Sequence, residues 1–185
     1  GLIWLVNIVF IYLTTPAVST SPVALSVPQP TPSSPDSSQQ SPQPQLKTPV
    51  GLLTKDIAQQ AVKNWLSAKT KSLNPQYQTD QLKDILVDPA LSLAIDRVKT
   101  AKAQGVHWVY KHPEIAIKPI PPANALATAA TIQAQVKENA QYYKGDRLDP
   151  SQSYSKTLLV EYNLVRQKDR WYVKNMDVIK SVDSN

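Results

Sequence analysis

The stretch ALSLAIDRVKTAKAQGVHWVYK, residues 90–111, contains the change of hydrophobic period that decides the fold. Up to Gln104 its apolar residues recur at helical spacing, and Asp88-Pro89 supplies a capping residue followed by a proline suited to the first helical position. Gly105 stands where a left-handed helix cap belongs. Beyond it the pattern alternates with a period of two, which predicts a strand with one buried face. That face carries Val106, Trp108 and Tyr110.

Upstream of this stretch the sequence predicts two further helices. Thr54 can cap a helix over residues 55–73, with Asp56 in its first turn complementing the helix dipole. Thr79 gives a second start signal, for a short helix over residues 80–86. The predicted apolar face of the first helix carries Ile57, Ala61, Trp65 and Ala68, with Val62 and Leu66 beside them.

Downstream, the alternating pattern recurs. His112-Pro113 interrupts the first strand, and EIAIKPI resumes it as a second strand. The Ala-rich stretch that follows could pass for a helix, but its alternation from Thr131 onward favours a strand. Helices followed by strands are the α+β pattern, so we predict helices packed on one face of a mainly antiparallel sheet. Strands are predicted over residues 106–111, 114–120, 125–143, 154–164 and 171–179, with a turn at 167–170.

Two segments precede the predicted domain. Residues 1–18 carry no charge and are rich in Ile, Leu, Val and aromatic side chains. A membrane-spanning helix needs about 20 apolar residues, so we interpret them as the end of a transmembrane helix in a truncated chain, with the core of a signal peptide as the alternative. Residues 19–50 are dominated by Ser, Pro and Gln, a composition that predicts a disordered linker. The folded domain is predicted over residues 51–185.

The composition excludes several kinds of chemistry. The chain has no cysteine, which excludes disulfides, thiolate zinc sites and cysteine nucleophiles. Its 20 Lys and Arg residues are interleaved with 14 Asp and Glu residues, so no nucleic acid is predicted as a partner. The four glycines are isolated, so the sequence offers no phosphate-binding or dinucleotide loop. No cofactor is predicted, because the G-x-S-x-G and H-E-x-x-H motifs are missing as well.

The two histidines decide whether an enzyme is predicted. His107 and His112 lie five positions apart, so an ideal strand directs them to opposite faces. Only Glu114 is near enough in sequence to join them in a metal site, and no metal site is predicted. Acid–base catalysis by a histidine with Asp96, Glu114 or Glu138 remains the alternative, although such carboxylates are usually solvated. We therefore predict no catalytic residue.

Several segments of the domain together resemble one family. They are AQQAVKNWLSAK, HWVYKHPEIAI, IQAQVKENAQYY, SYSKTLLVEYNLVR and RWYV, in this order within residues 55–180. The set is similar to the IMS domain of cyanobacterial and plastid division proteins, the Ftn2/ZipN and ARC-like proteins. The chain departs from the pattern of that family in its last hairpin, where Asn163 follows Tyr162 and Arg170 precedes Trp171.

The resemblance implies a membrane protein with a single-pass anchor, whose C-terminal domain lies in the periplasm or the plastid intermembrane space. There it would bind the tail of another division protein. Related folds resemble the nuclear transport factor cone, a curved sheet and helices around a concave pocket, which hosts both enzymes and binding modules. Because the catalytic signals are missing, we expect a non-enzymatic protein-interaction domain. Open alternatives are a small-ligand-binding or enzymatic domain of that fold, and a regulatory domain fused to another membrane protein such as a kinase.

The predicted contacts with the partner are large strand side chains and lysines. Aromatic side chains give much contact area for little entropy, and a lysine can bind a terminal carboxylate. Binding requires an apolar groove with an aromatic floor, whereas an enzyme requires His107 or His112 facing a deep pocket beside a carboxylate. Trp65, Trp108 and Trp171 are predicted to be mostly buried. The candidate contacts are Tyr110, Lys111, Tyr142, Tyr143, Tyr154, Lys156 and Tyr162.

Overall fold

The structure is a computed structural model, and it describes residues 52–120 and 127–184. The transmembrane helix predicted over residues 1–18 and the linker predicted over residues 19–50 lie outside the described residues. In the described part of the chain, no helix combines the length and the apolar character needed to cross a membrane.

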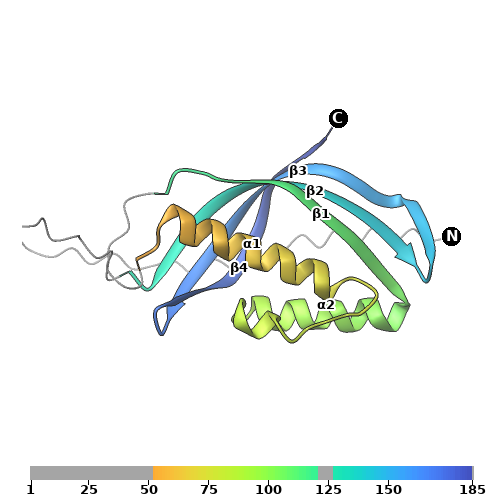
Figure 1. The fold of residues 1–185 in the computed structure, drawn as a ribbon, viewed down its shortest axis with the longest axis horizontal. Coiled ribbons are helices and arrows are strands. Elements are labelled where there is room, and N and C mark those ends of the chain that lie inside the picture. Colours follow the sequence, from red (N-terminus) through yellow and green to blue (C-terminus); the bar gives the residue numbers. More distant parts are fainter. Residues whose placement is uncertain (1–51, 121–126, 185) are drawn as a thin grey trace, which may run out of the picture. The chain divides into compact units, whose positions relative to one another are not determined.

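Two helices pack on one face of a four-stranded antiparallel sheet, whose strands arch over them (Figure 1). Each strand pairs with the next one along the chain, so the order in the sheet is the order in the sequence. The predicted α+β class, with helices before strands, is confirmed. The elements are α1 (Lys55–Ser72), the 3-10 turn η1 (Leu82–Asp84), α2 (Ala90–Gln104), β1 (Val106–Ile117), β2 (Ala129–Lys144), β3 (Arg147–Gln167) and β4 (Arg170–Asp183).

The helix ends follow the local signals in the sequence. The hydroxyl of Thr54 accepts a hydrogen bond from the N–H of Ile57 at 3.2 Å, as expected of an N-cap. The carboxylate of Asp88 accepts the N–H of Ser92 at 3.1 Å, but Pro89 is the N-cap of α2 and the helix begins at Ala90, so the prediction of Asp88 as the cap and Pro89 as the first helical residue is wrong by one position. Gly105 has a φ of 64° and ends α2 in the left-handed conformation that favours glycine.

Helix α1 is rotated from its predicted facing. The buried stripe runs through Ala58, Val62 and Leu66, whereas Ile57 is 38% exposed. The placement of Ile57 on the buried face is therefore wrong. Ala58, Val62 and Leu66 follow one another at an unbroken spacing of four, and this stripe faces the sheet. The neighbouring stripe that contains Ile57 and Ala61 is left at the side of the helix.

The helix predicted over residues 80–86 is wrong, because only the single turn η1 forms there. After this turn the backbone pairs with β4. The N–H of Val173 donates to the carbonyl of Ile85 at 2.9 Å, and the N–H of Val87 donates to the carbonyl of Val173 at 3.1 Å. Through these bonds Leu86 forms a parallel β-bridge with Val173, which is far along the chain. The backbone is therefore extended at Leu86 and the helix cannot continue.

The strand break predicted at His112-Pro113 is also wrong, because β1 continues through it. The pairing with β2 shifts between Lys111 and Glu114, which is a β-bulge. A proline is tolerated there because β1 is an edge strand, whose outer side needs no N–H. His112 lies two positions after Tyr110 and therefore on the same face, with ring centroids 6.0 Å apart. Beyond the bulge the buried face changes from even to odd positions, so that Ile117 is buried like Tyr110.

The buried apolar side chains form two clusters. The larger one lies between α1, the η1 region and the middle of the sheet, and the smaller one lies between Leu73, α2 and the start of β1. Trp65, Trp108 and Trp171 keep only a minor part of their surface exposed, so the prediction that they are mostly buried is confirmed. All three pack at the borders of these clusters, where a large indole ring keeps one edge in solvent.

Candidate functional site

The seven sequence-predicted contact residues separate onto the two faces of the sheet. Lys111 is exposed on the outer face, away from the helices. On that face Tyr143 stacks on His107, with ring centroids 4.9 Å apart. The structure therefore does not bring all seven residues together. The inner face carries Tyr110, Tyr142, Tyr154, Lys156 and Tyr162.

The inner-face residues differ in what they contact. Tyr162 is 1% exposed and belongs to the larger core cluster. Tyr142 lies edge-on to Trp108, with ring centroids 5.1 Å apart. The ammonium of Lys156 lies 5.6 Å from the centre of the Tyr154 ring. Tyr142, Tyr154 and Lys156 keep partly exposed side chains, so these three are accessible to a ligand.

A buried polar cluster is centred on Glu138, whose side chain is 2% exposed. Lys69 Nζ donates to Glu138 Oε2 at 2.6 Å, and His112 Nε2 lies 2.8 Å from the same oxygen. The Tyr154 hydroxyl donates to Glu138 Oε1 at 2.6 Å. Lys69 Nζ also lies 4.2 Å from the centre of the Tyr110 ring. These five residues, from α1 and three neighbouring strands, form the Glu138 cluster.

The charges in the Glu138 cluster are fixed by burial and by its hydrogen bonds. Burial alone would raise the pKa of Glu138, but the hydrogen bond from His112 and the charge of Lys69 outweigh it and lower the pKa to about 2. Because Glu138 is then ionised and can only accept, His112 Nε2 donates in their bond. Burial lowers the pKa of Lys69, against the opposing attraction of Glu138. Burial raises the pKa of Tyr110 to about 12 and also raises the pKa of Tyr154.

The Glu138 cluster has the geometry of an acid–base pair but not its chemistry. A general base works best with a pKa near the operating pH and within reach of a substrate proton. Glu138 has a pKa of about 2 and already accepts bonds from Lys69, His112 and Tyr154. None of the three surface hollows described below is lined by His112 or Glu138. The cluster therefore fits a structural anchor between α1 and the sheet.

Sequence reasoning missed Lys69, although the chain carries a signal for it. Lys69 follows Leu66 by three positions and Val62 by seven, so it continues the buried stripe of α1. A lysine at such a position needs a buried carboxylate, and Glu138 stands on the buried face of β2. Within residues 52–120 and 127–184, no three His, Cys, Asp or Glu side chains gather in a way that could hold a metal.

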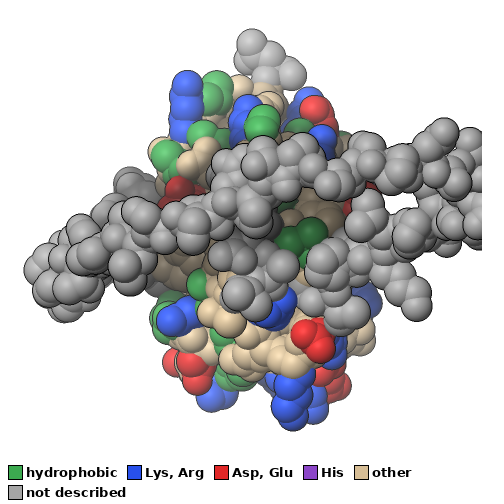
Figure 2. Space-filling model, turned by 90° about the vertical axis from the view of Figure 1, so that its left-hand side faces the viewer, with side chains coloured by type: hydrophobic (Ala, Val, Ile, Leu, Met, Phe, Trp, Pro, Cys, Tyr) green, Lys and Arg blue, Asp and Glu red, His purple; other side chains and the backbone are tan. Residues whose placement is uncertain are grey.

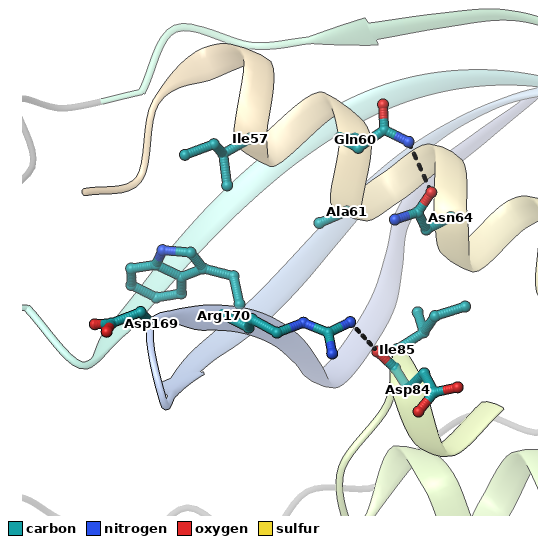
Figure 3. Close-up of a pocket in the computed structure, with 9 residues that line it drawn as sticks. Ile57, Gln60, Ala61, Asn64, Asp84, Ile85, Asp169 and Arg170 are labelled. Carbon is teal, nitrogen blue, oxygen red and sulfur yellow. Dashed lines mark hydrogen bonds between the residues drawn. The ribbon is translucent and has the colours of Figure 1, made fainter. Parts of the chain in front are cut away.

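A second candidate site is an open groove beside α1 (Figure 3). Its hollow measures about 290 Å³ and lies between α1, the η1 region and the turn before β4. The turn and α1 face one another across it, whereas the apolar periodicity of α1 predicted Ile57 on the buried face. The nine lining residues, which we call the α1 groove, are the apolar Ile57, Ala61, Ile85 and Trp171 and the polar Gln60, Asn64, Asp84, Asp169 and Arg170.

The polar rim of the α1 groove is partly tied down. Gln60 Nε2 donates to Asn64 Oδ1 at 2.7 Å on the helix side, and Arg170 reaches across to the carbonyl of Asp84 at 3.4 Å (Figure 3). A second hollow of about 340 Å³ shares four of the nine residues and extends the groove to Lys71. The two hollows thus follow one side of α1 for most of its length. Among the nine lining residues there is no histidine.

Comparison with known proteins gives one family and one similar fold. Residues 58–174 match the model of the family described as ARC6-like, IMS domain. The crystal structure of the intermembrane space region of the chloroplast protein ARC6 is similar, with a TM-score of 0.61 and 18% identity over 68% of this chain and 96% of that one. This likeness supports the fold. No curated protein sequence matches the chain.

Two other solved structures are more distant. A type 2 hexachlorocyclohexane dehydrochlorinase has a TM-score of 0.43 and 10% identity over 69% of this chain and 89% of that one. A de novo designed β-sheet protein has a TM-score of 0.36 and 13% identity over 70% of this chain and 88% of that one. At such scores neither structure carries an argument about function.

Proposed function

The chain belongs to the family of ARC6-like IMS domains, and on that premise we propose that its folded part is a non-enzymatic protein-interaction domain. Its ligand is the tail of a partner in the division machinery of plastids or cyanobacteria. The domain binds that tail as a short peptide segment in the α1 groove.

The observation that carries the proposal is the exposed apolar surface of the α1 groove. Ile57 is 38% exposed in a hollow whose apolar side is completed by Ala61, Ile85 and Trp171. An apolar cleft with an aromatic wall and a few amide groups on its rim is the usual form of a peptide-recognition groove. The amides of Gln60 and Asn64 can bond to the backbone of an extended peptide.

The Glu138 cluster supports the proposal that the domain is not an enzyme. Its carboxylate is ionised and saturated with donors, so it contributes to the seating of α1 on the sheet and not to proton transfer. The enzymatic alternative would need His107 or His112 to face an open pocket, and neither histidine lines the hollows described here.

Tyr142, Tyr154 and Lys156 are proposed as a secondary contact for the same partner, because they remain partly exposed on the inner face. Tyr110 and Tyr162 are proposed to support this surface from within the packed interior. Lys111 and Tyr143, on the outer face, would have to meet a different part of the partner.

We also propose that residues 1–18 anchor the protein in a membrane and that residues 19–50 act as a flexible linker. The likeness to an intermembrane space region supports a location beyond a membrane, in the periplasm or the plastid intermembrane space. The chain should stay in the membrane pellet after alkaline carbonate extraction, and the domain should be protected from protease until that membrane is opened. Release by carbonate would contradict the anchor.

The binding site is tested by capture of membrane proteins from the source organism on the immobilised chain. Ile57→Glu places a charge in the groove and should reduce capture of the partner at least tenfold, which corresponds to about 1.4 kcal/mol. Leu93→Glu on α2 is the matched control, because Leu93 is 44% exposed and lies outside the groove. Equal capture by wild type and Ile57→Glu would exclude the α1 groove. Turnover of a small substrate that His112→Ala abolishes would restore the enzymatic alternative.

A further inference from the structure

The C-terminal half of β4 is an edge of the sheet that carries exposed apolar side chains. β4 is the last strand in the order of the sheet, so one side of it has no neighbouring strand. Its first half is covered, because residues 85–87 pair with Val173. From Val178 to Asp183 every residue is exposed, and Val178, Ile179 and Val182 are 58%, 50% and 50% exposed.

The opposite edge of the sheet, on β1, is protected in the ways that proteins usually use. The N–H of Trp108 donates to the carbonyl of Leu73 at 2.8 Å, and the hydroxyl of Tyr77 donates to the carbonyl of Val106 at 2.9 Å. Further along, β1 carries the bulge that contains Pro113. Edges left open invite another strand, so natural sheets block them by such means. In the described part of the chain, the second half of β4 carries the open edge with apolar side chains.

A hollow of about 400 Å³ lies beside this edge on the outer face of the sheet. Leu159 of β3 lines this hollow, and the next residue, Val160, is buried on the helix side of the sheet. Because neighbouring strand residues point to opposite faces, the hollow faces away from the helices. Leu159 and Val182 supply apolar surface, and Lys118 and Lys180 supply two positive charges, neither of which is ion-paired within residues 52–120 and 127–184. In Figure 2, Lys and Arg side chains stand beside hydrophobic ones at the top of the molecule, the side that the sheet occupies in Figure 1.

We propose that the open half of β4 is a second docking surface, where an acidic segment of a partner protein adds as a fifth strand. Backbone hydrogen bonds to residues 180–183 would hold the segment, as in other cases of strand addition. Its side chains alternate between the faces, so an acidic residue would meet Lys180 while an apolar residue two positions away meets Val182. This surface shares no residue with the α1 groove.

Charge favours an acidic partner over a second copy of the chain. Two copies paired edge to edge with the symmetry axis at Lys180 would put the two Lys180 side chains directly opposite one another, and like charges across strands destabilise pairing. A lysine on an edge strand is a common device against such self-pairing. The chain as a whole carries a net charge of +6, which adds to the repulsion between copies and to the attraction of an acidic segment.

The test measures binding of two synthetic peptides to the full chain in detergent, by fluorescence anisotropy. Every second residue of both peptides is threonine, and the positions between are alternately valine and glutamate in one peptide and valine and lysine in the other, so that one face carries apolar and charged residues two positions apart. The glutamate peptide should bind, the lysine peptide should not, and Lys180→Glu should weaken the first at least tenfold while it gains binding of the second. This gain cannot come from misfolding. Lys174→Glu is the matched control, because Lys174 is exposed on the covered half of β4, and it should change either affinity less than twofold.

Amide hydrogen exchange locates the bound peptide and separates this proposal from the α1 groove. The glutamate peptide should protect residues 180–183, and Ile57→Glu should leave its binding unchanged. Equal binding of both peptides, or an unchanged affinity of Lys180→Glu, would overturn the proposal. A dimer of the chain that Ile179→Glu dissociates would also overturn the proposal. The same holds if residues 180–183 are protected from exchange without peptide and lose this protection when residues 1–50 are removed. Those two results would assign the edge to a second copy or to the chain's own N-terminal segment.

Discussion

Replacement of Glu138 by glutamine removes one charge from the interior and leaves the shape of the side chain nearly unchanged. Lys69, whose side chain is 13% exposed, then loses its counter-charge, and the bonds from His112 and Tyr154 lose their ionised acceptor. Breaking a buried ion pair from one side costs about 3–5 kcal/mol. The pKa of Glu138 gives a similar value, because a fall from 4.5 to about 2 corresponds to about 3 kcal/mol. We expect Glu138→Gln to lower the free energy of unfolding by about 3 kcal/mol at pH 7.

The pH dependence of this effect is specific to an ionised Glu138. Its pKa is lower in the folded state, so as the pH falls the unfolded chain binds the proton first. The stabilisation is therefore complete above about pH 4.5 and is lost as the pH falls toward 2. Urea unfolding followed by circular dichroism should show the difference between wild type and Glu138→Gln shrinking over that range. A difference below about 0.5 kcal/mol at pH 7, or one that does not change with pH, would refute the anchor.

A double variant serves as the control for this experiment. Lys69→Met with Glu138→Leu removes both charges together and replaces them with apolar groups of similar size. Such replacements are often neutral or stabilising, whereas the single changes are costly. The double variant should therefore be more stable than Glu138→Gln. If both variants are equally unstable, the loss comes from packing and not from an uncompensated Lys69.

Three further predictions concern the fold and its boundaries. A fragment that starts near residue 51 should melt with the same cooperativity and midpoint as the full chain in detergent, and a large loss of melting temperature would show that the linker is a packed segment. Gly105→Ala should destabilise by about 1 kcal/mol in urea unfolding, because an alanine must adopt a φ of 64° there although no atom lies within 4 Å of the added Cβ. Trp108→Ala should cost about 2 kcal/mol by the same assay, less than a fully buried tryptophan, because the ring is partly exposed beside Tyr142 and Arg97.

The sequence predicts correctly those features whose structure is determined by residues close together in the chain. Thr54 and Gly105 set the ends of α1 and α2 through their own backbone and side-chain geometry, and the alternation along β2 and β3 arises from strand pleating. Local signals fail where a distant residue intervenes. η1 is cut short by Val173, and the strand continues at Pro113 because the bulge on an edge strand tolerates it.

The candidate sites are harder to predict for the same reason. Residue type predicts the tyrosines as contacts, but only the direction in which each side chain faces separates Tyr162 in the core from Tyr143 on the outer face. The Glu138 cluster unites positions 69, 110, 112, 138 and 154, and no spacing in the chain connects all of them. The α1 groove exists because α1 buries the stripe of Ala58 and leaves that of Ile57 uncovered. Periodicity alone does not choose between two adjacent stripes of one helix.

The central claim is that the α1 groove holds a segment of a partner protein. Its most direct test is site-specific photo-crosslinking in the native membrane, with a photoreactive residue in place of Ile57 and, as the control, in place of Leu93 on α2. One discrete cross-linked protein is expected from position 57, mapped by mass spectrometry to one short peptide, and none is expected from position 93. The same products from both positions, or none from position 57 while the wild type still captures the partner, would contradict this claim.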